Sequence, residues 1–267
     1  MLMLKNLILL TRPVRYWFGN MTYATSKENV ALEEFCGKFK NRPMLVIGNG
    51  PSLNKTPLDD FISIPSIGMN KIDLLFPHVK WRPTYIVCIN NFVVRQHWCL
   101  MLKSNIPTLL SWNCRYFIPR SQRYQFRYFL TSLSSDFATN ITKGLGSVAT
   151  VTYTALQIAF YMGADPAILF GVDHSFSTTG KPCEYALRKG ADIDHFAPNY
   201  FKAGTYWGLP DLKSSELGYQ NAKKAFERDG RAIYDATIGG KLDIFPKISI
   251  EEAKKMCSLP EYKALEI

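Results

Sequence analysis

The chain has 267 residues, of which 47% are hydrophobic, 13% aromatic and 20% charged. A chain of this size and composition builds one large domain or two small ones around a sizeable core, which excludes a disordered tail, a coiled coil and a collagen-like fibre. Its 32 Lys and Arg residues exceed its 22 Asp and Glu residues, giving a formal net charge of +10. This excess favours an anionic partner: nucleic acid, a phosphorylated substrate or an acidic membrane surface.

The first 18 residues combine a short apolar run with Arg12, Arg15 and a following aromatic cluster. The run is shorter than the roughly 20 residues that span a bilayer, and its positive charges follow it rather than precede it as in a signal peptide. Residues 1–18 therefore predict a helix that either makes a peripheral contact with an anionic membrane or packs on the core. We assign residues 1–42 to an N-terminal helical segment.

Six short apolar runs along the body of the chain are expected to be strands: 44–49, 63–70, 84–90, 107–112, 167–173 and 232–237. They are apolar throughout rather than alternating, which is typical of strands buried on both faces of a parallel sheet. Helical spacing is clearest over 147–163, where Ser147 can cap the start, and over 214–229. The alternation predicts an α/β, doubly wound, mainly parallel sheet over residues 43–247, followed by a helical tail over 248–267.

The six cysteines are scattered, and none has metal-ligand spacing beside a histidine. They indicate a reducing, cytoplasmic compartment and no metal site. No nucleophile elbow and no nucleic-acid-binding motif is present, so nucleic acid is not expected as the partner.

Glycines and polar residues follow the first expected strand as Gly48-Asn49-Gly50-Pro51-Ser52. A glycine turn that opens a helix aims free amides and the positive helix end at one point, which favours phosphate. A structural tight turn remains the alternative. The dinucleotide fingerprint requires a third glycine where Leu53 stands, which disfavours an NAD site.

Further polar residues follow the other expected strands, where a doubly wound fold places its ligand. Asn70 and Asn90 end the next two strands, and asparagine suits ribose hydroxyls and base edges but is also a common turn residue. Gly146 and Ser147 open the long helix and offer a second helix start, or simply an ordinary cap. These residues predict a crevice for a nucleotide mono- or diphosphate.

Acid–base groups follow the 167–173 strand and occur in a later loop. Asp173 and His174 end that strand, where they suit catalysis or metal binding, although Asp173 can instead cap a loop. His195 lies among aromatic residues that include Tyr200 and Tyr206. Residues of about 175–213 are expected to form a lid over the site.

The combination of V-I-G-N-G-P-S-L, I-L-F-G-V-D-H-S-F and H-F-A-P-N-Y-F in this order resembles the 6-hydroxymethylpterin diphosphokinase-like (MptE-like) family. It is more distantly similar to the bacterial lipooligosaccharide sialyltransferases. The resemblance covers roughly residues 43–247 and implies a Rossmann-like fold of the sialyltransferase type.

The sialyltransferase likeness implies a glycosyltransferase that takes a CMP-linked sugar and needs no cofactor, with a glycan or lipid-linked acceptor in surface-polysaccharide or lipopolysaccharide synthesis. It implies donor contacts from the turn at residues 48–52 together with Asn70, Asn90, Gly146, Ser147 and Tyr200. It also implies a histidine base, for which His195 and His174 are candidates and Tyr206 a third. The family histidine has no counterpart at the matching position, KAGTYWG. The diphosphokinase likeness instead implies ATP and magnesium, with Asp173 as a ligand.

Overall fold

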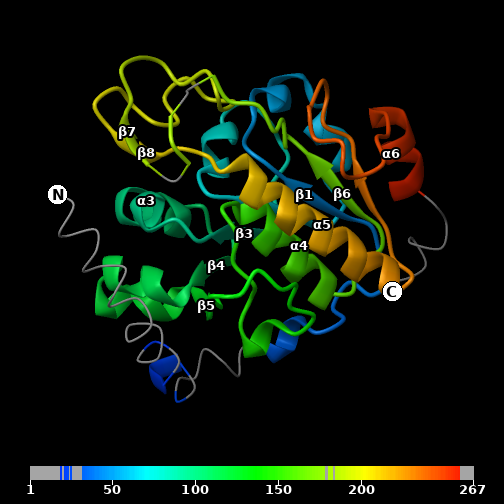
Figure 1. The fold of residues 1–267 in the computed structure, drawn as a ribbon, viewed down its shortest axis with the longest axis horizontal. Coiled ribbons are helices and arrows are strands. Elements are labelled where there is room, and N and C mark those ends of the chain that lie inside the picture. The colour runs from blue at the N-terminus through cyan, green and yellow to red at the C-terminus, as the bar shows by residue number, and fades with distance from the viewer. Residues whose placement is uncertain are drawn as a thin grey trace.

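Seven parallel strands form the central sheet of the protein, in the order β5-β4-β3-β2-β1-β6-β9 (Figure 1). The computed structural model describes residues 19, 21–23, 25, 32–177, 180–182 and 184–258. The strands are β1 (Met44–Ile47), β2 (Ser66–Met69), β3 (Tyr85–Cys88), β4 (Thr108–Ser111), β5 (Arg127–Phe129), β6 (Ala167–Phe170) and β9 (Ile233–Asp235). The expected parallel α/β fold is confirmed, and each of the six expected runs contains a strand.

The order of the strands reverses beside β1. The chain builds the sheet outward from β1 to β5 on one side and then returns to place β6 against the other side of β1. In open α/β sheets such a reversal leaves a crevice at the carboxyl ends of the strands, because the connections leave in opposite directions. The topology therefore positions a ligand site between the loops that follow β1 and β6.

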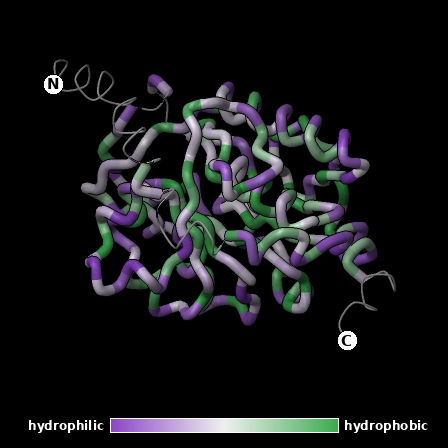
Figure 2. The backbone as a smooth tube through the Cα atoms, turned by 90° about the horizontal axis from the view of Figure 1, so that it is seen from below, coloured by the Kyte–Doolittle hydropathy of each residue, from purple (hydrophilic) through white to green (hydrophobic). Residues whose placement is uncertain are grey.

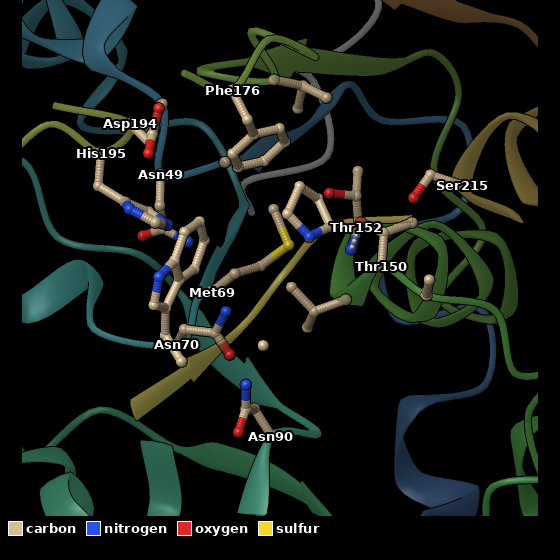
Figure 3. A pocket seen from close by; sticks show the side chains of 18 of the residues that line it. Asn49, Met69, Asn70, Asn90, Thr150, Thr152, Phe176, Asp194, His195 and Ser215 are labelled. Atoms are coloured by element: carbon tan, nitrogen blue, oxygen red, sulfur yellow. Dashed lines mark hydrogen bonds between the residues drawn. The ribbon is translucent and has the colours of Figure 1, made fainter. Parts of the chain in front are cut away.

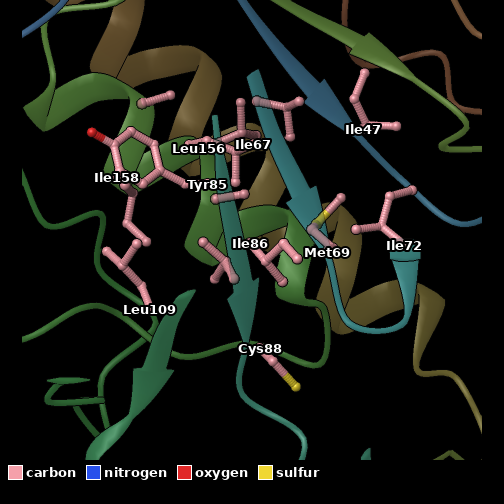
Figure 4. Close-up of a cluster of buried hydrophobic side chains, with 14 of the residues drawn as sticks. Ile47, Ile67, Met69, Ile72, Tyr85, Ile86, Cys88, Leu109, Leu156 and Ile158 are labelled. Atoms are coloured by element: carbon pink, nitrogen blue, oxygen red, sulfur yellow. The ribbon is translucent and has the colours of Figure 1, made fainter. Parts of the chain in front are cut away.

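The described helices are α3 (Asn91–Lys103), α4 (Val151–Tyr161), α5 (Leu212–Arg228) and α6 (Ile250–Cys257), and most other connections are short 3-10 helices. α4 packs on β1, β2 and β3, and α5 packs on α4. Figure 4 shows Leu156 and Ile158 of α4 against Ile67 and Ile86 of the sheet. In Figure 2 the hydrophobic stretches gather toward the middle of the molecule.

Two helix starts differ from the prediction. α4 begins at Val151 rather than near Ser147, because the side chain of Thr150 caps it by accepting from the Thr152 amide at 3.2 Å. α5 begins at Leu212 and is capped by Asp211. In the tail, α6 carries a full capping box between Ser249 and Glu252.

An antiparallel hairpin that the sequence did not predict stands apart from the sheet. It pairs β7 (Tyr185–Leu187) with β8 (Tyr206–Gly208), and Figure 1 shows it at the upper left. The edge strand β5 was also missed, because it lies in the stretch RYQFRYF, where polar residues interrupt the apolar run.

Some predictions lie outside the described residues. They include the helix over 1–18 with its membrane contact, and the last part of the tail after residue 258. Within the described ranges, the structure contains no helix with the length and apolarity needed to cross a bilayer.

Candidate active site

A cavity of about 500 Å³ lies at the carboxyl ends of β1, β2, β3 and β6. The loops after these strands, the starts of α3 and α4, and segment 171–212 line it (Figure 3). This is the crevice that the strand order predicts, and its size is typical of a site for a small organic ligand. That residues 175–213 act as a moving lid stays a prediction.

The turn after β1 forms part of the wall but does not present the free amides that the sequence predicted. The Gly48 amide donates to the Phe170 carbonyl at 2.7 Å, and the Gly50 amide donates to the Gly171 carbonyl at 2.9 Å. The Ser52 amide donates to Asp173 Oδ1 at 3.1 Å. That prediction is therefore wrong for these three amides.

The two glycines are required by close packing. A Cβ on Gly48 would stand 2.1 Å from the Gly171 oxygen, and one on Gly50 would stand 1.8 Å from Asp173 Oδ2. Pro51 and Ser52, also predicted to contact the donor, do not line the cavity. The turn serves to bring β1 and β6 together at the base of the crevice.

Asp173 lines the cavity but uses both carboxylate oxygens to hold the turn. Oδ1 accepts from the Ser52 amide at 3.1 Å and Oδ2 accepts from the Ser52 hydroxyl at 2.7 Å. These bonds fit the loop-capping alternative for Asp173 rather than a catalytic carboxylate.

Three asparagines end β1, β2 and β3, and all three line the cavity (Figure 3). Asn49 Oδ1 and Asn70 Oδ1 are buried and have no hydrogen-bond donor among the described residues. Asn90 Oδ1 caps α3 by accepting from the Phe92 and Val93 amides, which leaves its NH2 group to donate. A ligand with both hydroxyl and acceptor groups would satisfy this set.

The second predicted loop approaches the cavity through different residues. Gly146 is buried beneath the wall, where its amide donates to Gln157 Oε1 at 2.8 Å, and the Ser147 amide donates to Ser134 at 2.8 Å. Neither residue lines the cavity, and the first turn of α4 with Thr150 and Thr152 does so instead. Gly146 and Ser147 therefore do not reach the cavity, and the part of this segment that does is the start of α4.

His195 forms a carboxylate–imidazole pair with Asp192 on the wall. Its Nδ1 lies 2.9 Å from Asp192 Oδ2, and the ring stacks on Tyr200 with centroids 4.1 Å apart and planes 4° from parallel. Because an ionised carboxylate only accepts hydrogen bonds, Nδ1 carries a proton, and in the neutral form of the ring Nε2 then has the free lone pair. This is the arrangement required of a general base.

Asp192 is held ionised by its surroundings. Desolvation by burial, the largest single effect, opposes ionisation, but the His195 hydrogen bond and charge, the Asp194 amide and Arg188 together lower the pKa of Asp192 below its usual value. Arg188 bonds both Asp192 and Asp194, and Asp194 in turn accepts from the amide and hydroxyl of Ser177. The loop is therefore cross-linked around the base.

Tyr200, predicted to contact the donor, lines the cavity from behind His195. Burial raises the pKa of its phenol, which therefore stays neutral. The ammonium of Lys71 donates to the Tyr200 carbonyl at 2.8 Å and lies over the Phe201 ring. Tyr200 and Lys71 together fix the plane on which the imidazole rests.

The other two candidate bases differ in position. His174 lines the cavity from the loop after β6, with Nε2 2.9 Å from Glu216 Oε1. Tyr206 lies on β8, is 57% exposed and does not line the cavity. His174 thus also forms a carboxylate–imidazole pair, but the Glu216 side chain is 47% exposed whereas that of Asp192 is fully buried, which makes the His195 pair the better-shielded one. The position of Tyr206 does not suit a base.

Sequence reasoning missed Asp192, Arg188, Thr150 and Thr152. Asp192 stands three residues before His195, and that spacing was the available signal. No group of three or more His, Cys, Asp or Glu side chains within the described ranges is arranged to hold a metal ion. The diphosphokinase alternative requires Asp173 as a magnesium ligand. Both carboxylate oxygens of Asp173 are instead bonded to Ser52, which does not fit a metal ligand.

The amino-acid sequence matches no protein-family model and no curated protein sequence. Its structure is similar to that of the MAf glycosyltransferase from Magnetospirillum magneticum AMB-1, with a TM-score of 0.50 and 15% identity over 89% of this chain. The match spans only 40% of that longer chain. The sialyltransferase CstII from Campylobacter jejuni, solved in complex with cytidine-5'-monophosphate, gives a TM-score of 0.46 at 13% identity, over 79% of this chain and 86% of that chain. At these identities the first likeness shows the fold, and membership in the MptE-like family stays a prediction.

Proposed function

We propose that this protein is a glycosyltransferase that moves a sugar from a nucleotide-activated donor of the CMP type to a hydroxyl group of a glycan or lipid-linked acceptor. The observation that carries the proposal is the His195–Asp192 pair on the wall of a cavity at the carboxyl ends of the parallel strands. The fold likeness to the MAf glycosyltransferase supports it at the level of architecture.

In this reaction His195 Nε2 takes the proton of the acceptor hydroxyl as its oxygen bonds to the anomeric carbon of the sugar. The bond between that carbon and the phosphate oxygen breaks, and its electron pair stays with the nucleotide. Asp192 stabilises the imidazolium that forms, as a buried carboxylate does for a histidine base. General-base assistance of this kind contributes about 10²–10⁴ in rate.

The charges around the cavity support a donor with one phosphate. Among its described lining residues there is no Lys or Arg. Stabilisation of the departing phosphate then falls to the dipoles at the N-termini of α3 and α4 and to the NH2 group of Asn90. Because such partial charges balance one phosphodiester charge better than two, the cavity favours a CMP-linked over a UDP- or GDP-linked sugar. We also propose that transfer requires no metal cofactor, as the resemblance to the sialyltransferases implies.

A nucleotide panel tests the donor class. The unfolding midpoint is measured with CMP, UDP, GDP and ATP, each with magnesium and with excess chelator. We expect CMP to raise the midpoint in both conditions, since a ligand at a hundred times its Kd stabilises by about 2.7 kcal/mol. Release of CMP from a CMP-sugar by the wild-type protein then tests catalysis. Stabilisation by ATP alone, and only with magnesium, would support the diphosphokinase instead.

A further inference from the structure

A second region of the molecule gathers positive charge and exposed aromatic rings along one edge of the sheet. The 3-10 helices η5 (Trp112–Phe117) and η6 (Arg120–Gln125) connect β4 to the edge strand β5. Tyr116 is 63% exposed, Phe117 36% and Tyr124 74%. With the exposed Arg120 and the half-buried Arg123, these residues form what we term the basic-aromatic surface.

Most of the net charge of the protein belongs to this part of the chain. Residues 74–135 contain no Asp or Glu, and their cations are Lys80, Arg82, Arg95, Lys103, Arg115, Arg120, Arg123 and Arg127. Of these, Arg127 lies 3.5 Å from the carboxylate of Glu34. No described carboxylate pairs with Arg95, Lys103, Arg120 or Arg123. Of these four, Arg120 and Arg123 belong to the basic-aromatic surface, and no described carboxylate neutralises their charge.

The exposed rings are held in place rather than loosely attached. The Arg115 guanidinium stacks on the rings of Trp112 and Tyr116, at 3.8 and 4.1 Å from their centroids, and donates to the Tyr116 hydroxyl at 2.7 Å. Ile118 and Phe126 are buried and anchor the two 3-10 helices. Arg123 Nε donates to the Ile118 carbonyl at 3.0 Å. The packing thus fixes a group of aromatic rings at the surface, and such a group is typical of an interaction site.

We propose that the basic-aromatic surface docks this protein on an anionic phospholipid bilayer. Arginines attract anionic headgroups, and tyrosine rings favour the headgroup level of a bilayer. Phe117 and the exposed Leu100 of α3, which packs against η5, add apolar area that acyl chains accommodate and a sugar-phosphate backbone does not. A second copy of the same surface would bring like charges together, which disfavours self-association through it.

Flotation of the full-length protein with lipid vesicles tests the proposal. Vesicles of pure phosphatidylcholine are compared with vesicles of phosphatidylcholine and phosphatidylglycerol at 7:3 in 0.1 M NaCl. We expect binding to the anionic vesicles only. Arg120→Glu changes the charge by two units at an exposed site, so its partition coefficient should fall about 25-fold, since one basic residue near such a surface is worth about a factor of five.

Lys224→Glu on the exposed side of α5 is the matched control, because it makes the same change of charge away from the β4–β5 edge (Figure 1). It should alter the partition coefficient by less than about threefold, since the charge lies beyond a Debye length of about 10 Å from the bilayer. Tyr124→Ser should weaken binding several-fold without changing the unfolding midpoint.

Three outcomes would overturn the proposal. They are equal binding to both vesicle types, equal effects of Arg120→Glu and Lys224→Glu, and an unchanged partition coefficient in Arg120→Glu. Binding of a single-stranded oligonucleotide that Arg120→Glu abolishes, without vesicle binding, would assign the surface to nucleic acid. A change of oligomeric state in Arg120→Glu, again without vesicle binding, would assign it to a second copy.

Discussion

The cavity and the basic-aromatic surface differ in charge, although the net charge of +10 predicted only that the protein has an anionic partner. The cavity has no Lys or Arg among its described lining residues and offers amides, hydroxyls and two histidines. The basic-aromatic surface has arginines without described carboxylate partners. A basic composition therefore points to an anionic partner of the molecule, but it does not locate the reacting phosphate, which helix ends and neutral groups can hold.

The largest effect that we expect is the loss of turnover when His195 in the cavity is replaced. His195→Ala should lower kcat by about 10²–10⁴ with a CMP-sugar donor, because it removes the proposed general base. The CMP-induced rise in unfolding midpoint and the binding to anionic vesicles should both persist, since the variant leaves the nucleotide contacts and the arginines in place.

Tyr206→Phe is the control for that variant, because Tyr206 lies off the cavity and should tolerate the change with less than a twofold effect on kcat. If His174→Ala lost all turnover while His195→Ala kept it, the general base would be His174 rather than His195.

Asp192→Asn should lower kcat by a smaller factor, about 10- to 100-fold, because the amide no longer stabilises the imidazolium or fixes its tautomer. The remaining oxygen can still accept from Arg188 and the Asp194 amide, whereas the new NH2 group cannot accept from the Phe201 amide. Steady-state kinetics should show the loss in kcat with KM for the donor nearly unchanged. An equal rise in KM would indicate that the loop had moved and that Asp192 serves binding.

The pH dependence of unfolding distinguishes the charge of Asp192 from its packing. The pKa of Asp192 in the folded protein lies below the ordinary aspartate value, so the ionised carboxylate stabilises the fold at neutral and mildly acidic pH. This contribution disappears as the pH falls through the lowered folded pKa. The difference in free energy of unfolding between wild type and Asp192→Asn should therefore persist at pH 5 and shrink below pH 4. A difference that is the same at pH 3 would assign it to packing.

The sequence predicted the sheet well because its strands are buried on both faces and so stand out as uninterrupted apolar runs. It predicted the start of α4 less well, because Ser147 and Thr150 are both good caps and only tertiary contacts choose between them. Whether the amides after β1 are free or hydrogen-bonded depends on residues after β6, among them Asp173, which lies 121 residues from Ser52. No local pattern reveals such a partner. The role of Asp192 was equally hidden, because a pairing within an irregular loop has no periodicity.

Salt concentration should separate the two regions directly. Raising NaCl from 0.05 to 0.5 M screens exposed charges, so binding of the wild type to anionic vesicles should fall by more than about tenfold. The Kd for CMP should change by less than about threefold, because no described lysine or arginine lines the cavity. Isothermal calorimetry for CMP and flotation for vesicles measure the two responses. A steep salt dependence of CMP binding would show that cationic side chains reach the nucleotide after all.

The smallest expected effect concerns the turn after β1, which we assign to packing rather than to the phosphate. Ser52→Ala removes the 2.7 Å bond to Asp173 Oδ2 and should lower the free energy of unfolding by about 1.5–3 kcal/mol, the range for hydrogen bonds to charged groups. Its Kd for CMP should stay within about twofold of the wild type, since Ser52 does not line the cavity. Ser121→Ala, at an exposed position of η6, should change neither quantity. Weaker CMP binding at unchanged stability would instead indicate that the turn contacts the nucleotide, as the sequence predicted. Only a direct contact would weaken binding without lowering the free energy of unfolding.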